Sequence, residues 1–238
     1  KNGAPTTISE TALAWTGRTV GPDDNIMWAD EAWHYNNNGA LYKKDEVNEG
    51  VPTLFHHALA QIRFQGKVTK TEETVAGKTV KWTVTVNELK LSKVANQGTF
   101  SLTNSDPGEN KTKEWTVTEW ASLSGAADVA PTLENTTLAK DPKYIFAWQS
   151  VIPQPTSDVE MTVKFTVKTE YVGTSTVTVE EVVEKTAKLS DFTVDIANWE
   201  RNKRYTYTLI IEPDTSVIKI IPVESNWEEG ATKEITVE

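Results

Sequence analysis

Hydrophobic and polar residues alternate with a period of two along much of the chain. Over residues 79–86, valine or tryptophan occupies every second position, and threonine or lysine lies between them. Residues 161–168 repeat the pattern with methionine, valine and phenylalanine. Such alternation is typical of strands with one buried face and one solvent-exposed face. It predicts these two strands, and shorter runs predict further strands at 88–94, 99–103, 114–120, 174–179, 205–211, 217–223 and 234–237.

Turn-forming residues separate these runs, and no convincing amphipathic helix is present. Glycine follows Asn38, Pro107 and Ser124, and the prolines at 153 and 155 break another run. Residues 9–15 are compatible with a turn or two of helix, and residues 182–189 are ambiguous. Many short strands with this punctuation predict an all-β fold built from β-sandwiches.

The least strand-like part of the chain predicts a domain division. Residues 121–143 are loop-rich and lack a strong alternating pattern. We therefore expect one β-sandwich domain over residues 1–122 and a second over residues 123–238, since the chain is long enough for two. A single extended sandwich is the alternative.

Composition and charge exclude several classes of function. The 238 residues carry a formal net charge of −10, and a surface that acidic repels phosphate backbones, so we expect no nucleic-acid partner. The lack of cysteine excludes disulfides, thiolate nucleophiles and cysteine-ligated zinc. No apolar run reaches the ~18 residues that span a bilayer. Residues 1–5 are too polar for a signal peptide, so we expect either a cytosolic protein or a processed form without its leader.

Two of the three histidines are adjacent, in the apolar run 54–64. Neighbouring residues of a strand point to opposite faces, so His56 and His57 are poorly placed to share a metal ion, and His34 is the remaining histidine. No Gly-x-Ser-x-Gly elbow supplies a nucleophile. We expect a strand in which one histidine is buried and hydrogen-bonded and the other lies on a less buried face. A helix is the alternative, because residues 54, 58 and 62 would form an apolar stripe.

Acidic pairs and tryptophans are the remaining candidates for chemistry. With 34 acidic residues, adjacent carboxylates arise by chance, and glycosidase acids are recognised by a separation in space that sequence does not give. We expect no catalytic residue, no metal and no cofactor. Trp28 and Trp33 flank an acidic patch, and they could stack on sugar rings if both were exposed. This possibility makes a surface glycan-binding β-sandwich the alternative function, while packing in a core is the simpler interpretation of both residues.

Several segments, in order along the chain, match the sequence signatures of one known family. Residues 55–64 (FHHALAQIRF) resemble the family's F-x-H-A-L-A/S-K-V/I-x-F strand, with Gln61 where lysine is usual. Residues 199–207 resemble its W-x-x-G-x-x-Y-x-Y hairpin, with Asn202 in place of the glycine. That change is mild, because asparagine also tolerates positive φ. Weaker matches are the D-aliphatic-M-aromatic-A segment at 24–29, the Pro-Gln turn at 152–154 and the closing strand at 223–227. Together, these segments resemble the fimbrillin and Mfa-like proteins, which are surface pilus subunits of Bacteroides-type bacteria.

This resemblance carries its own expectations. It implies two tandem β-sandwiches of the transthyretin-like or Greek-key type, export as a lipoprotein through the outer membrane, and display in a cell-surface fimbrium with a role in adhesion. It also implies that a trypsin-like protease removes an N-terminal segment and leaves a groove. The implied partners are other copies of the chain or related pilus subunits in a head-to-tail filament, with a host glycan or protein as a further possibility. No enzymatic activity is implied.

The end of the chain is the candidate donor strand for such an assembly. A sandwich that lacks a strand exposes unpaired backbone groups and an apolar groove, and a neighbour's strand completes it. Residues 230–238 would reach about 30 Å when extended, at ~3.3 Å each. Ile235 and Val237 would be the anchors on one face, with Thr232 and Thr236 in the same strand. The alternative is an ordinary edge strand of its own domain.

Overall fold

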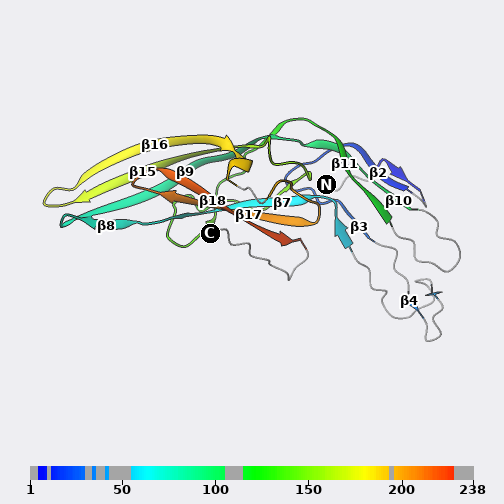
Figure 1. Cartoon of the computed structure of the whole chain (residues 1–238), viewed down its shortest axis with the longest axis horizontal. Coiled ribbons are helices and arrows are strands. Elements are labelled where there is room, and N and C mark those ends of the chain that lie inside the picture. The colour runs from blue at the N-terminus through cyan, green and yellow to red at the C-terminus, as the bar shows by residue number, and fades with distance from the viewer. Residues whose placement is uncertain are drawn as a thin grey trace.

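The computed structural model is elongated and almost entirely β (Figure 1). It describes residues 5–9, 12–29, 34–35, 41–42, 55–104, 115–192 and 196–227. Within these residues the sole helical element is a single 3₁₀ turn, η2 (Leu189–Asp191). The predicted all-β fold class is confirmed.

Three sheets contain most of the strands. The small sheet has the order β1 (Thr7–Ile8), β2 (Ala12–Thr19), β10 (Gln97–Asn104), β11 (Trp115–Ser124). The long sheet has the order β12 (Ala127–Val129), β9 (Lys78–Val94), β15 (Glu160–Val172), β16 (Val177–Lys188), and β8 (Glu72–Val75) also pairs with β9. The mixed sheet has the order β13 (Lys143–Tyr144), β7 (Ala60–Val68), β17 (Lys203–Glu212), β18 (Val217–Asn226), and β14 (Gln149–Val151) also pairs with β7. Two isolated pairs complete the set: β3 (Met27–Ala29) with β6 (Phe55–His57), and β4 (His34–Tyr35) with β5 (Leu41–Tyr42).

The alternating pattern places the strands correctly where it is strongest. The predicted strands 79–86 and 88–94 are one 17-residue strand, β9. Its pairing with β15 shifts between Lys164 and Phe165, so Asn87 is an extra residue in β9. Such a bulge exchanges the two faces, which is why the buried positions change from even to odd numbers and keep Leu89 and Leu91 inside.

Two segments left open by the sequence are assigned by the structure, and one local prediction is wrong. Of the possible helical turn at 9–15, residues 12–15 instead belong to strand β2, paired with β10. The ambiguous residues 182–189 lie largely in strand β16. The apolar run 54–64 is not one strand, since a bend at 58–59 separates β6 from β7.

One strand pairing departs from the antiparallel expectation. β7 and β17 run parallel over eight paired residues, from Gln61 opposite Arg204 to Val68 opposite Ile211. The strands are more than 130 residues apart in the chain, so no local turn sets their direction.

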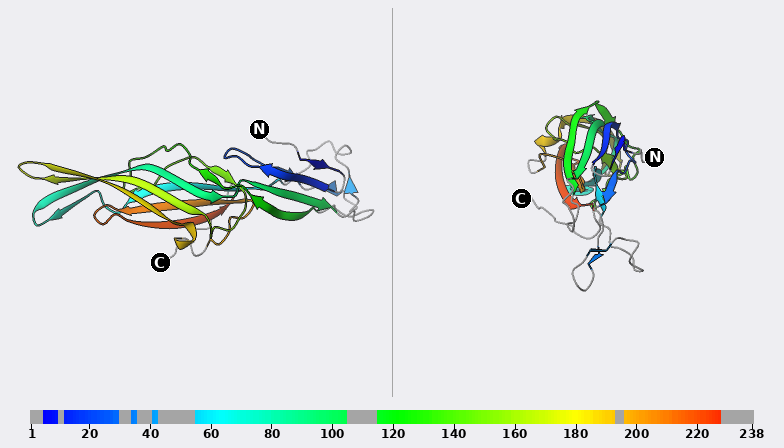
Figure 2. Two further views of the ribbon diagram at one scale, coloured as in Figure 1. Left: turned by 90° about the horizontal axis from the view of Figure 1, so that it is seen from above. Right: turned by 90° about the vertical axis from the view of Figure 1, so that its right-hand side faces the viewer.

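Two hydrophobic cores lie along the molecule. The larger core fills the space between the long sheet and the mixed sheet, with Phe64, Phe165 and Tyr207 fully buried. The smaller core lies between the small sheet and the β3–β6 pair, around Phe100 and Trp28. In the left-hand view of Figure 2, the small sheet lies at one end and the hairpin tips of the long sheet at the other.

Strand pairing crosses the position where the sequence predicts a domain division. β9 pairs with β15, and β7 pairs with β17, so the larger core draws on strands from both sides of residues 122–123. The smaller core likewise combines residues near the start of the chain with Ile152 and Trp227. The division into domains over 1–122 and 123–238 stays a prediction.

Candidate functional site

The segments that carry the family resemblance meet at a junction between the two cores. Gln154 is 7% exposed, and its amide spans the end of β9: Oε1 accepts from the Ala95 N–H at 2.8 Å, and Nε2 donates to the Ala95 carbonyl at 3.2 Å. Nε2 also donates to the carbonyl of Ile152 at 3.0 Å. The Gln154 backbone exchanges two hydrogen bonds with Trp199. The Pro-Gln turn therefore links three separate segments by hydrogen bonds.

The hairpin at 199–207 is fixed by its own side chains. The Trp199 indole donates to the Tyr207 hydroxyl at 2.7 Å, and the Glu200 N–H donates to the Tyr205 hydroxyl at 2.9 Å. Burial raises the pKa of both tyrosines, although these donated hydrogen bonds act in the opposite direction. Asn202 has φ of 61°, which confirms that it occupies the left-handed position expected of the family's glycine.

The two adjacent histidines take packing positions. They lie in β6, so the predicted strand is confirmed there, but both are half-buried and the expectation of one fully buried histidine is wrong. His57 Nδ1 lies 2.8 Å from the Asn25 Oδ1, and its ring stacks on Trp227 with centroids 4.0 Å apart. His56 stacks on Trp28 at 5.1 Å. No group of three potential metal ligands occurs within the described ranges.

Of the sequence-derived site residues, Trp28 alone lies within the described part of the chain. Trp28 is 5% exposed and packs in the smaller core, which leaves little of its face for a sugar ring. Trp33 lies outside the described residues, as do the candidate donor-strand residues, Thr232, Ile235, Thr236 and Val237.

A cavity of about 710 Å³ lies at the junction. Its lining includes residues 19–23, at the end of β2, and residues 127–132, which follow β11. Three carboxylates line it, those of Asp23, Asp128 and Glu134. Asp128 forms an ion pair with Lys90 at 3.4 Å. These acids come from three different segments and form no metal-ligand group among the residues described, so the cavity carries no sign of catalysis.

The feature with the clearest capacity for an interaction is the free edge of β16. β16 has 12 residues, pairs only with β15 among the described strands, and contains no proline. The other long edges are protected: β18 contains Pro222, and the pairing of β11 is interrupted by register shifts. Half of the backbone N–H and C=O groups of β16 therefore point away from the sheet without a strand partner.

Apolar residues that belong on a buried face remain exposed along β16. Val177 and Val179 lie on the same face as Val183, which is in the larger core, yet they are 56% and 51% exposed. The cause is that the long sheet extends past the end of the mixed sheet (Figures 1 and 2). We call this extension, made of β8 and the adjoining halves of β9, β15 and β16, the arm.

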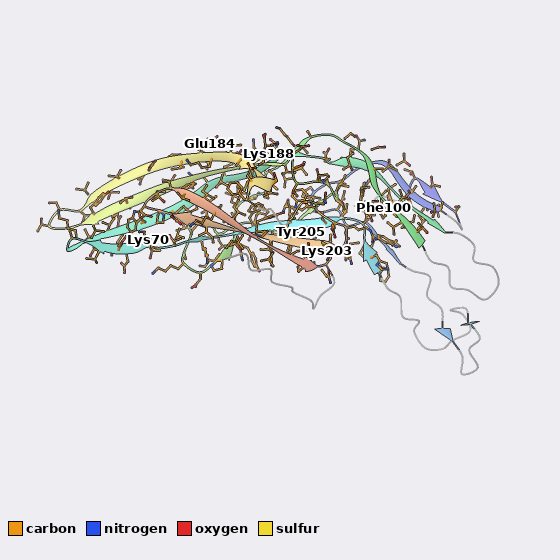
Figure 3. All side chains as sticks on the ribbon, viewed as in Figure 1. Lys70, Phe100, Glu184, Lys188, Lys203 and Tyr205 are labelled. Atoms are coloured by element: carbon orange, nitrogen blue, oxygen red, sulfur yellow. The ribbon has the colours of Figure 1, made fainter. Side chains whose placement is uncertain are left out.

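Two grooves reach this margin. One, of about 520 Å³, crosses the inner face of the arm from Val75 of β8, past Trp82 and Tyr171, to Val179 of β16. The other, of about 310 Å³, lies between β16 and the start of β18, and its apolar lining comes from Met161, Ala187, Phe192, Val217 and Ile218. Figure 3 shows Glu184 and Lys188 on the same strand, at the outer margin of the sheet. An unpaired strand beside apolar grooves is a surface that can take up another strand.

Only the start of this edge strand was predicted from the sequence. A strand was expected at 174–179, but 182–189 stayed ambiguous, because a strand exposed on both faces lacks clean alternation. None of the described residues forms a helix of the length and hydrophobicity needed to cross a membrane.

Comparison with known proteins assigns the chain to a family. A family model described as fimbrillin-like matches residues 20–228. No curated protein sequence matches the chain. Among solved structures, it is similar to a fimbrial protein from Bacteroides vulgatus, with 16% identity and a TM-score of 0.47, over 91% of this chain and 68% of that chain. It is also similar to a proposed cell adhesion protein from Bacteroides uniformis, with 11% identity and a TM-score of 0.43, over 91% of this chain and 71% of that one. Because the family model spans residues 20–228, most of the sequence, the chain belongs to the fimbrillin-like family.

Proposed function

We propose that this chain is a structural subunit of a cell-surface fimbrium that acts in adhesion and assembles with like subunits by strand donation. Two observations support the proposal: membership of the fimbrillin-like family, and a long unpaired edge strand, β16, beside apolar grooves. The second observation carries the assembly mechanism. Export as a lipoprotein through the outer membrane follows from the family resemblance and is part of the same proposal.

We assign the acceptor role to β16. A donated strand would pair with its free backbone groups and extend the long sheet, and alternate side chains would cover Val177 and Val179. Sheet extension at β18 is disfavoured, because Pro222 lacks a backbone N–H.

The proposed donor is the end of the chain, residues 230–238 of a neighbouring copy. Burial of Ile235 and Val237 would contribute on the order of 3–6 kcal/mol, before backbone pairing is counted. Donor and acceptor are different surfaces, so their pairing is head-to-tail and builds an open filament rather than a closed dimer.

Two double variants test the two halves of this proposal separately. Ile235→Asp with Val237→Asp removes the donor anchors, and Val177→Asp with Val179→Asp places charges on the acceptor face. Filament formation is followed by electron microscopy and size-exclusion chromatography, before and after limited trypsin treatment. We expect filaments from the unmodified protein and folded monomers from either double variant. An equimolar mixture of the two variants retains one intact donor and one intact acceptor, so it should give heterodimers and no filaments.

Ile8→Asp is the matched control, because Ile8 is 69% exposed but lies in the small sheet. It should leave filaments intact. Filaments from the donor variant would show that residues 230–238 are not the donor, and filaments from the acceptor variant would show that β16 is not the acceptor. Unmodified protein that never polymerises, with or without trypsin, would count against assembly by strand donation altogether.

A further inference from the structure

A row of polar side chains lies on the outer face of the mixed sheet, opposite the face that packs in the larger core. Three residues of β7 contact the residues directly opposite them on β17: Arg204 Nε donates to Gln61 Oε1 at 3.0 Å, and Arg63 Nε donates to Thr206 Oγ1 at 3.1 Å. The third pair, Gln65 Nε2 with Thr208 Oγ1, is 2.7 Å apart. The parallel register fixes all three contacts, so the row is held rigidly on a sheet.

Two aromatic rings from the β13–β14 segment cover the centre of this row. The Arg63 Cζ lies 3.6 Å from the centroid of the Tyr144 ring and 4.0 Å from that of Trp148. The Arg204 Cζ also lies near Trp148, at 5.3 Å. The segment is anchored, because Asn135 Nδ2 donates to the Tyr144 carbonyl at 2.7 Å and the Ile145 N–H donates to the Phe64 carbonyl at 2.9 Å. Rings and guanidinium are thus positioned before any ligand arrives.

The Arg63 cation is not neutralised by the part of the chain that the structure describes. No carboxylate of the described residues forms an ion pair with it, although the whole chain has a net charge of −10. Burial and the charge of Arg204 both lower the pKa of Arg63, while Tyr144 raises it. Two neighbouring guanidinium groups repel each other, and partial burial makes the charge of Arg63 still less favourable. An anion bound between or beside them would offset this unfavourable electrostatic free energy.

We propose that Arg63, Tyr144 and Trp148 form a binding site for a carboxylated sugar, such as a uronic acid. Thr206 holds Arg63 at Nε, so the terminal N–H groups of the planar guanidinium are the ones that would bind the carboxylate, in the forked geometry that arginine prefers. Tyr144 is 44% exposed, and the partial negative charge on the face of its ring attracts the C–H groups on the apolar side of a sugar. Beside it, the half-buried Gln65 side chain would hydrogen-bond ring hydroxyls, and the buried Thr208 holds that side chain in place.

The chemistry of this site favours an acidic sugar over other ligands. A neutral sugar would use the ring face but leave Arg63 without a counter-charge. A nucleic acid would bring many phosphates to a chain of net charge −10, which repels them. A simple carboxylate would neutralise Arg63 but make no use of the exposed aromatic face. The site does not depend on strand donation, since none of its residues lines either of the grooves beside β16.

The test is a calorimetric titration of the folded chain with glucuronate, glucose and acetate in turn. Glucuronate combines both features of the proposed ligand, glucose lacks the charge, and acetate lacks the ring. We expect saturable binding of glucuronate at least tenfold tighter than either comparison compound, and weaker at high ionic strength. Binding of acetate or glucose as tight as glucuronate would overturn the assignment, as would the absence of saturable binding by glucuronate.

Variants distinguish a binding role for Arg63 from a purely structural one. Arg63→Gln should lower the affinity for glucuronate by about 10- to 100-fold, since a charge-assisted hydrogen bond is lost. Arg63→Lys keeps the charge but not the fork, and it should recover only part of that loss. Arg201→Gln is the matched control, because Arg201 also lies over a tryptophan, Trp28, but is already paired with Glu119. Circular dichroism and thermal melting verify that each variant is folded. Unchanged affinity in folded Arg63→Gln would overturn the proposal.

Discussion

Replacement of Gln154 by methionine tests whether the hydrogen bonds of the Pro-Gln turn stabilise the junction between the two cores. Methionine has a similar length and no amide, so the substitution deletes three hydrogen bonds without a large cavity. The Ala95 N–H loses its acceptor, and the carbonyls of Ala95 and Ile152 each lose a donor. An unsatisfied N–H costs about 1–3 kcal/mol, and carbonyls tolerate the loss better because each has two lone pairs.

The expected cost of Gln154→Met is therefore about 2–3 kcal/mol of unfolding free energy. For a chain of this size, 1 kcal/mol corresponds to about 2–4 °C in Tm, so the melting temperature should fall by roughly 4–12 °C. Urea denaturation measures the free energy, and amide hydrogen exchange at Ala95 measures the local effect. Exchange should accelerate at that N–H, because its acceptor is gone.

Gln149→Met is the matched control for this substitution. Gln149 is half-buried, and its side chain donates only to the carbonyls of the neighbouring residues Ala147 and Trp148. Its loss leaves no N–H without an acceptor and should cost less than about 1 kcal/mol. Equal effects of the two variants, or a cost below about 0.5 kcal/mol for Gln154→Met, would refute the view that this amide ties the end of β9 to the junction.

Two further predictions concern the hairpin that follows. Asn202 has φ of 61° and a buried Oδ1 with no hydrogen-bond partner among the described residues, so Asn202→Gly should stabilise the fold by about 0.5 kcal/mol and Asn202→Ala should destabilise it by about 1 kcal/mol. An alanine variant as stable as the glycine variant in urea denaturation would contradict this. Burial raises the pKa of Tyr207 in the folded state, so above about pH 10 the unfolded chain loses a proton that the folded chain keeps, and stability should fall as pH rises. In Tyr207→Phe, that fall should be shallower by up to about 1.4 kcal/mol per pH unit; an unchanged slope would show that the phenol does not titrate as described.

The strands with one buried face could be predicted from the sequence, because that burial imposes a two-residue period of hydrophobic residues. β15 and the two halves of β9 follow it closely. The prediction failed where that cause is missing. β16 is exposed on both faces over most of its length, so its residues carry no alternation. β2 was not predicted as a strand, because it has no charged residue before Arg18 to mark its polar face.

Pairing between distant strands could not be predicted in the same way. The alternating hydrophobic pattern of β7 indicates that one of its faces is buried. It does not indicate that β17 lies beside it in parallel. That choice depends on the fit of whole sheets around Phe64 and Tyr207, whose rings stack at 4.9 Å. The predicted division after residue 122 rested on local composition, and local composition contains no record of such long-range pairing.

The candidate sites differ in how visible they were. The family resemblance singled out Gln154 and Asn202, although the sequence could not say that one spans Ala95 and the other turns a hairpin. The Arg63 cluster left no comparable sign. Its members are separated by about 80 residues, and polar residues on the outer face of a strand are ordinary wherever they occur.

Uneven protection of the sheet edges is the strongest physical argument for a partner strand. β1 is only two residues long, β18 contains a proline, and β8 and β12 flank the other margin of the long sheet. These are the devices by which soluble proteins avoid edge-to-edge association. β16 has neither a proline nor a covering strand among the described residues; its protection is limited to charged side chains such as Glu184 and Lys188, and Val177 and Val179 remain exposed beside its free backbone. This longest unpaired edge among the described strands is explained if another strand occupies it when the subunit is assembled.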